Sequence, residues 1–144
     1  MPDKFWLTIR GTQRYEGQDP EQLELETEAE MTHEGGILCL RYAESELTGL
    51  KGTLTTFEIR PHKVLLHRRG LVNNDMEFVQ GTFHRSLYDM GQEALMITIH
   101  TTLIEDRMTL AGGTLRIVYD INIEHLGMGT IEYCLTARPM EKDG

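Results

Sequence analysis

The chain has 144 residues, 40% of them hydrophobic and 26% charged, and a formal net charge of −9. This length fits one domain, expected over residues 1–144, that is large enough to fold without a metal or a disulfide. The composition excludes a disordered chain, and no apolar run approaches the roughly 20 residues of a membrane helix. The acidic balance argues against nucleic acid as a partner, because it repels a phosphate backbone.

Hydrophobic residues recur at every second position along most of the chain, a spacing typical of half-buried strands. No window combines a helical period with capping residues, so no helix of note is predicted. The breaks between the strands are rich in Gly, Pro and Asn. The pattern predicts nine strands, at residues 4–16, 21–33, 37–47, 53–60, 63–70, 75–84, 94–105, 113–124 and 128–138, and a short tenth strand within 85–91.

The first two predicted strands are expected to form a hairpin. One register places Arg14 opposite Glu24 and Arg10 opposite Glu28, so that opposite charges meet on the polar face and apolar residues meet on the other. Trp6 then lies on the outer face, where it either anchors a partner or packs under a loop.

The polar face of the second strand carries a row of acidic residues. The row consists of Glu24, Glu26, Glu28 and Glu30. We interpret it as a solvated outer face that Arg10 and Arg14 partly balance. The alternative is an acidic docking surface or a calcium site.

Five later strands carry polar residues on their apolar face, which alternation predicts to point inward. In the strand at 94–105 this face consists of odd-numbered residues, up to Leu103. The predicted inward-facing polar residues are Tyr42, Glu44, Thr55, Arg68, Thr101 and Tyr119.

The two cysteines, Cys39 and Cys134, are far apart in the sequence and lie within apolar strands. Two buried free thiols in a reducing cytosol are the favoured interpretation, and one disulfide is the alternative. The residues at the start of the chain do not resemble a signal peptide, so the protein is expected to be cytoplasmic.

Nine or ten short antiparallel strands must bury one face, in a closed barrel or in a two-sheet sandwich. The connections are short, which favours an up-and-down meander that closes on itself. We therefore predict an all-β, antiparallel up-and-down barrel of about eight to ten strands. A barrel of this size holds either packed side chains or one small ligand.

Several short motifs occur in a recognisable order along nearly the whole chain. They are YAESELTG at 42–49, GTLTT at 52–56, VLLHRRG at 64–70, MEF at 76–78 and GTLRIVY at 113–119. In this order they resemble the bacterial YwiB-like family of uncharacterised proteins. The resemblance implies a calycin-like, lipocalin-related β-barrel. The family brings no established catalytic residues, so no site residue is carried over from it.

An arginine that points into a barrel needs a partner, because an unpaired buried charge is very costly. One interpretation pairs Arg68 with Glu44. The other gives Arg68 the carboxylate or phosphate of a ligand, which the guanidinium fork can bind through two parallel hydrogen bonds, with Tyr and Thr hydroxyls assisting. No histidine pair has a metal-ligand spacing, so neither a metal nor another cofactor is predicted.

Three functions follow from these residues. The leading hypothesis is a non-catalytic cytoplasmic barrel that binds a small amphipathic or anionic molecule, with no nucleic acid and no membrane as partner. The second is an interaction or scaffolding module that uses the acidic outer face. The third is an acid–base enzyme built on Glu44 and Tyr119.

Overall fold

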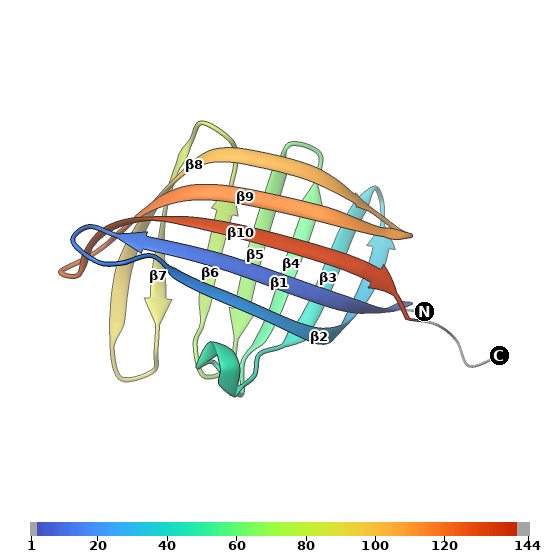
Figure 1. The fold of residues 1–144 in the computed structure, drawn as a ribbon, viewed down its shortest axis with the longest axis horizontal. Coiled ribbons are helices and arrows are strands. Elements are labelled where there is room, and N and C mark those ends of the chain that lie inside the picture. The colour runs from blue at the N-terminus through green and yellow to red at the C-terminus, as the bar shows by residue number, and fades with distance from the viewer. Residues whose placement is uncertain (1–2, 141–144) are drawn as a thin grey trace.

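Ten antiparallel strands make up most of residues 3–140, the part of the chain that this computed structural model describes (Figure 1). A single turn of 3-10 helix, η1 (Glu46–Thr48), lies between the third and fourth strands. The predicted all-β fold is confirmed, and so is the short tenth strand. The strands are β1 (Asp3–Tyr15), β2 (Glu21–Glu34), β3 (Ile37–Ala43), β4 (Leu54–Arg60), β5 (Lys63–Arg69), β6 (Asn74–Phe78), β7 (Phe83–Asp89), β8 (Ala94–Thr109), β9 (Gly112–Ile123) and β10 (Gly127–Pro139).

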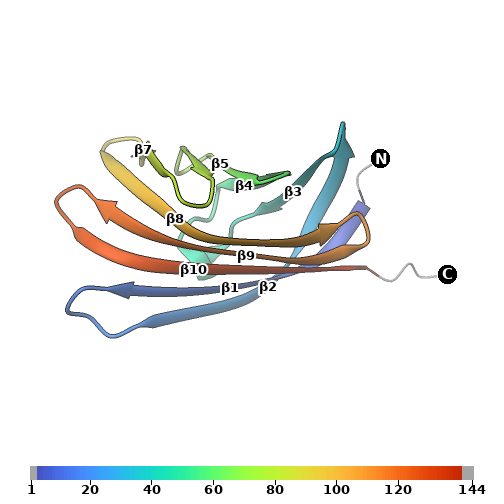
Figure 2. The same ribbon diagram turned by 90° about the horizontal axis from the view of Figure 1, so that it is seen from above.

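The strands form one sheet that curls into a nearly closed barrel. The order is β6-β5-β4-β3-β2-β1-β10-β9-β8-β7, so each strand pairs with its sequence neighbours and β1 pairs with β10. The ring is interrupted between β6 and β7, the two ends of the sheet. Among the described residues, one isolated bridge between Asn73 and Asp89 replaces a ladder of backbone pairs there. Figure 2 shows the long strands β8, β9, β10, β1 and β2 on one side and the shorter strands facing them. The up-and-down barrel is confirmed over the sandwich.

Two strand boundaries differ from the prediction. Residues 75–84, predicted as one strand, contain the end of β6, a turn, and the start of β7. Gly81 in this turn has a φ of 84°, and the Thr82 amide donates to the Val79 carbonyl at 3.0 Å. The strand predicted at 37–47 ends at Ala43, because the Ser45 side chain accepts a hydrogen bond from the Leu47 amide and caps η1.

The predicted register of the first hairpin is wrong by four residues. Arg10 lies opposite Glu24, not Glu28, and Ile9 lies opposite Leu25. Arg14 does not face Glu24, because it lies beyond the paired part of β2 and opposite Thr130 of β10. A shift of four keeps every side chain on its face and still pairs opposite charges, so alternation alone could not distinguish the two registers.

A bulge in β8 changes which residues face inward. The register with β9 shifts between Thr101 and Leu103. Beyond the bulge Ile104, and not the predicted Leu103, pairs with the buried Ile117 and packs against the core. An extra residue in one strand of a pair reverses the alternation that follows it.

The barrel interior has a packed half and a hollow half. Leu7, Leu115 and Leu135, on β1, β9 and β10, are fully buried in the packed half. Further along the same strands, Tyr119 and Ile131 line a cavity. The packing therefore closes one end of the barrel and leaves space toward the other.

Candidate functional site

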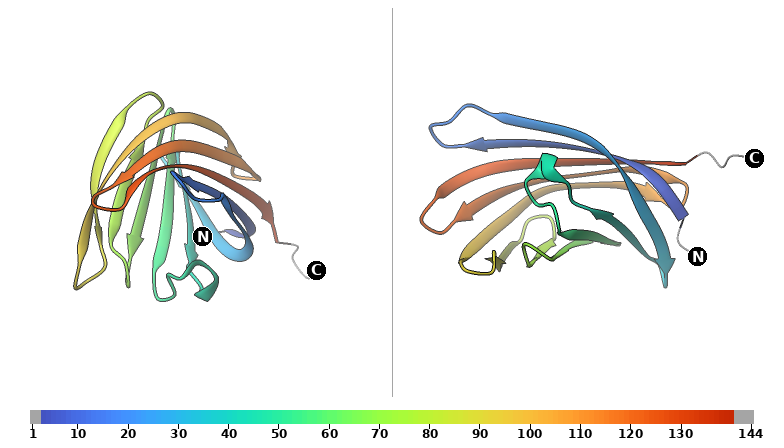
Figure 3. Two further views of the ribbon diagram at one scale, coloured as in Figure 1. Left: turned by 60° about the vertical axis from the view of Figure 1, so that its left-hand side comes forward. Right: turned by 90° about the horizontal axis from the view of Figure 1, so that it is seen from below.

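The hollow half of the barrel contains a cavity of about 370 Å³. Its lining includes the buried Tyr119 and also Leu126, which is 70% exposed, so the cavity extends from the interior to the surface. The segment that contains η1 lies in front of the barrel strands in the view from below (Figure 3), and its residues Thr48 and Leu50 contribute to the cavity lining. An aliphatic wall of the cavity is formed by residues of β8, β9 and β10, namely Leu95, Ile97, Ile121, Ile123 and Ile131.

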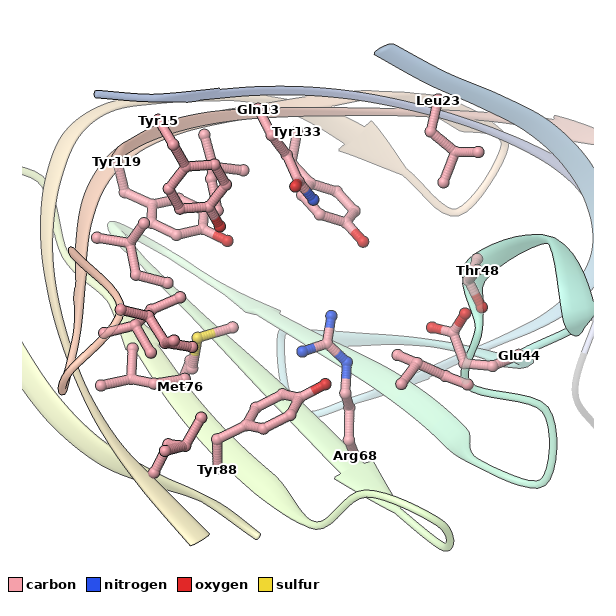
Figure 4. Close-up of a pocket in the computed structure, with 17 residues that line it drawn as sticks. Gln13, Tyr15, Leu23, Glu44, Thr48, Arg68, Met76, Tyr88, Tyr119 and Tyr133 are labelled. Carbon is pink, nitrogen blue, oxygen red and sulfur yellow. The ribbon is translucent and has the colours of Figure 1, made fainter. Parts of the chain in front are cut away.

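Arg68 projects from β5 into the middle of this cavity (Figure 4). The residue is only 8% exposed, and its Nε is buried without a hydrogen-bond partner. Among residues 3–140, no carboxylate oxygen lies within 4.0 Å of its guanidinium nitrogens. The expected alternative, a direct ion pair between Arg68 and Glu44, is therefore not formed.

Position 70, two residues after Arg68, requires a glycine. Gly70 has a φ of 137°, and a Cβ added there would lie 2.1 Å from the Gly52 carbonyl oxygen. This close approach joins the end of β5 to the turn before β4, where the Thr53 hydroxyl accepts a hydrogen bond from the Val72 amide. Gly70 thus lies where β5 ends, directly after Arg69.

Glu44 lies just beyond β3 and is the second charged residue in the cavity wall. It is 7% exposed, and its Oε1 accepts a hydrogen bond of 2.7 Å from the Thr55 hydroxyl. Its Oε2 is buried and has no partner. In Figure 4 its carboxylate and the Arg68 guanidinium face the same cavity from different parts of the wall.

Four tyrosines surround the Arg68 guanidinium. Burial alone would lower the pKa of this guanidinium, whereas the negative charge that Tyr133, Tyr119, Tyr42 and Tyr88 acquire when their phenols ionise raises it. The ring of Tyr119 packs at 5.0 Å from that of Phe78, and the ring of Tyr133 at 6.2 Å from that of Phe57.

The tyrosines around Arg68 are hydrogen-bond donors at neutral pH. Burial raises the pKa of Tyr42, Tyr119 and Tyr133 above the ordinary value for tyrosine. At neutral pH their phenols therefore keep their protons, while Arg68 keeps its positive charge. A cation with hydroxyl donors around it can bind an anionic group.

All six predicted inward-facing polar residues are buried, but only three reach the cavity. Glu44, Arg68 and Tyr119 line it. Thr55 lies behind Glu44, to which it donates its hydrogen bond, and Tyr42 faces Thr55 in the β3–β4 register. Thr101 lies elsewhere, where its backbone binds the turn at Gly81 and Thr82.

Five further polar residues of the lining are missing from the predicted set. Gln13 and Tyr15 lie on β1, Thr48 on η1, Tyr88 on β7 and Tyr133 on β10. Alternation on β1 and β10 places three of them on the apolar face, so the same rule could have found them. Tyr88 lies within the short strand predicted at 85–91, for which no inward face was predicted; in the structure it belongs to β7, which begins two residues earlier at Phe83.

The outer face of the barrel carries the acidic row. Glu24 pairs with Arg10 at 3.4 Å, as a balancing charge on β1 was expected to do, and Glu26 pairs with Arg138. Arg14 does not contribute an ion pair to the row, because it lies beyond the paired part of β2. Trp6 lies on the outer face as predicted and is half-buried.

Both cysteines are free thiols. Contrary to the prediction that they are buried, Cys39 and Cys134 are half-exposed, because they alternate with the inward residues of their strands. Within residues 3–140, no three His, Cys, Asp or Glu side chains gather in an arrangement that could hold a metal ion. The same residues contain no helix that is long and apolar enough to cross a membrane.

The fold and the cavity define a class of protein: a nearly closed, ten-stranded antiparallel barrel with a charged and phenolic interior. A family model described as "Domain of unknown function (DUF1934)" matches residues 7–135. The chain therefore belongs to this family.

A solved structure shares the fold. The crystal structure of the ywiB protein from Bacillus subtilis matches with a TM-score of 0.86 and 21% sequence identity, over 97% of this chain and 94% of that chain. The resemblance to the YwiB-like family is confirmed. No curated protein matches the chain.

Proposed function

We propose that this protein is a non-catalytic cytoplasmic binding barrel that holds a small amphipathic molecule by its anionic end. One observation carries the proposal: Arg68 is buried, has no carboxylate partner within 4.0 Å among the described residues, and lines the cavity. A buried guanidinium without an anion is costly, so an anionic ligand that pairs with Arg68 would stabilise the barrel.

The shape and lining of the cavity support the same kind of ligand. A volume of about 370 Å³ lies at the small end of the range for ligand pockets, roughly 300–1,000 Å³. Its aliphatic wall, which includes Ile97 and Ile121, suits an apolar tail, and Arg68 with its tyrosines suits a carboxylate or phosphate. The two free cysteines are consistent with a reducing compartment such as the cytoplasm.

The other two hypotheses have less support. An acid–base reaction at Tyr119 is disfavoured, because burial raises the pKa of its phenol and keeps the proton in place at neutral pH. Recognition through the acidic face of β2 is disfavoured, because two of its glutamates, Glu24 and Glu26, already pair with arginines of the same chain.

The proposal is tested by calorimetric titration with hexanoate, octanoate and decanoate, and with the neutral amide of each. We expect at least one acid to bind and its amide to bind at least about tenfold more weakly, since a hydrogen bond to a charged group contributes about 1.5–3 kcal/mol. Arg68→Met should remove the preference for the acid.

Arg69→Met is the matched control, because Arg69 is the next residue on β5 and its side chain is 56% exposed on the outer face, where it pairs with Asp75. This variant should bind the acids as the wild type does. Equal binding of acid and amide by the wild type, or no binding of any acid, would count against the proposal.

A further inference from the structure

The cavity contains a second buried charged group that an anionic ligand alone would leave without a partner. Glu44 is 7% exposed and lines the same cavity as Arg68. Thr55 satisfies its Oε1, but its Oε2 is buried and has no hydrogen-bond partner. No Lys, Arg or His nitrogen of the described residues lies within 4.0 Å of either oxygen.

Two opposite charges therefore face one cavity without contacting each other. The Nε of Arg68 and the Oε2 of Glu44 are each buried and unpaired. Hydrogen-bonding groups buried in this way are rare in folded proteins, because each one loses its water without gaining a partner. A ligand that hydrogen-bonds to both groups must carry an anionic acceptor for Arg68 and, on another atom, a hydrogen-bond donor for Glu44.

We propose that the ligand is zwitterionic, with an anionic group bound by Arg68, an ammonium group bound by Glu44, and an apolar tail against the aliphatic wall. This inference rests on the proposed function and names the class of molecule more narrowly. An ammonium is the matching group for Glu44, because it offers three donors and no acceptor. A carboxylate is the matching group for Arg68, because it can accept two parallel hydrogen bonds from one guanidinium.

A simple fatty acid does not meet this description. Its carboxylate would complete Arg68, but its tail would place only methylene groups next to the Glu44 Oε2. That oxygen would then be buried against apolar atoms without a donor. An amphiphile of the amino-acid type carries both charges on one head, one or two carbons apart, and so offers an anion for Arg68 and a donor for Glu44.

The test compares octanoate with 2-aminooctanoate and 3-aminooctanoate by calorimetric titration of the wild-type protein, with each enantiomer measured separately. We expect at least one amino acid to bind at least about tenfold more tightly than octanoate, because its ammonium gives the Glu44 Oε2 a charge-assisted hydrogen bond. This comparison changes only the ligand, so it does not depend on the folding of a variant.

Glu44→Gln should reduce that advantage to less than about twofold and leave octanoate binding within about twofold of the wild type. Glu46→Gln is the matched control, because Glu46 lies two residues away with its side chain 81% exposed. It should preserve the full advantage.

The outcomes separate this inference from the proposed function. If octanoate binds through Arg68 but no amino acid binds more tightly, the proposal of a zwitterionic ligand is wrong, and the proposal that Arg68 binds an anion is retained. An advantage that survives Glu44→Gln leads to the same conclusion. If none of the three ligands binds, this inference is contradicted, and the anion site is contradicted with it if hexanoate and decanoate also fail to bind.

Discussion

At the scale of single residues, the Glu44 carboxyl depends on one hydrogen bond from Thr55. The Thr55 hydroxyl is fully buried and donates at 2.7 Å to Oε1, while Oε2 has no partner. Thr55→Val removes the donor without changing the volume much. Both carboxyl oxygens are then buried and unpaired, so we expect the free energy of unfolding to fall by about 1–3 kcal/mol in urea denaturation.

Thr56→Val is the control for that variant, because Thr56 is the next residue on β4 and points to the other face. Its effect should stay within about 0.5 kcal/mol, as is usual for surface positions. Equal effects of the two substitutions would mean that the Glu44 carboxyl does not depend on Thr55.

Alternation predicted the burial of individual residues well. Thr55 and Arg68 are buried as predicted, Thr55 on the same face of β4 as the buried Phe57 and Ile59. What alternation could not predict is which buried polar groups meet. Whether Arg68 and Glu44 pair depends on the separation of two strands across the interior, which no local pattern encodes.

At the scale of elements, the weakest part of the barrel is the junction between β6 and β7. The two backbone hydrogen bonds between Asn73 and Asp89 are 2.8 and 2.9 Å long, and side chains make the other contacts. The buried Asn74 donates to the Leu87 carbonyl at 3.0 Å and to the Ser86 hydroxyl at 3.3 Å. A strand pair held in this way should open more readily than one with a full ladder.

Hydrogen exchange of Asn74→Ala tests this property of the junction. Loss of the two side-chain hydrogen bonds should speed amide exchange in β6 and β7 and leave β1 and β10 protected. The exposed Asn122 on β9 provides the control, and Asn122→Ala should leave the pattern unchanged. Uniformly faster exchange over all ten strands would show that the junction is no weaker than the rest of the barrel.

The elements themselves were predictable where turn residues interrupt the alternation, and less so where they do not. The first hairpin was expected, but its register was not fixed, because a shift of four preserves both faces and the charge pairs. The bulge after Thr101 and the turn at Gly81 were missed. Each depends on backbone pairing with a neighbouring strand, which side-chain alternation does not report.

At the scale of the whole molecule, the charge distribution separates two roles. The chain carries a net charge of −9, and a row of glutamates lies on the outside of β2. The interior instead holds the Arg68 cation, with Glu44 further along the same cavity wall. The outer charge suits solubility, whereas the inner pair of opposite charges suits recognition.

The most direct test of the central claim is native mass spectrometry of the protein purified from its own host. We predict that the wild type carries a noncovalent small-molecule adduct, released on denaturation, and that Arg68→Met purified in the same way lacks it. The account would be contradicted if the wild type showed only the mass of the chain, or if Arg68→Met retained the same adduct in full.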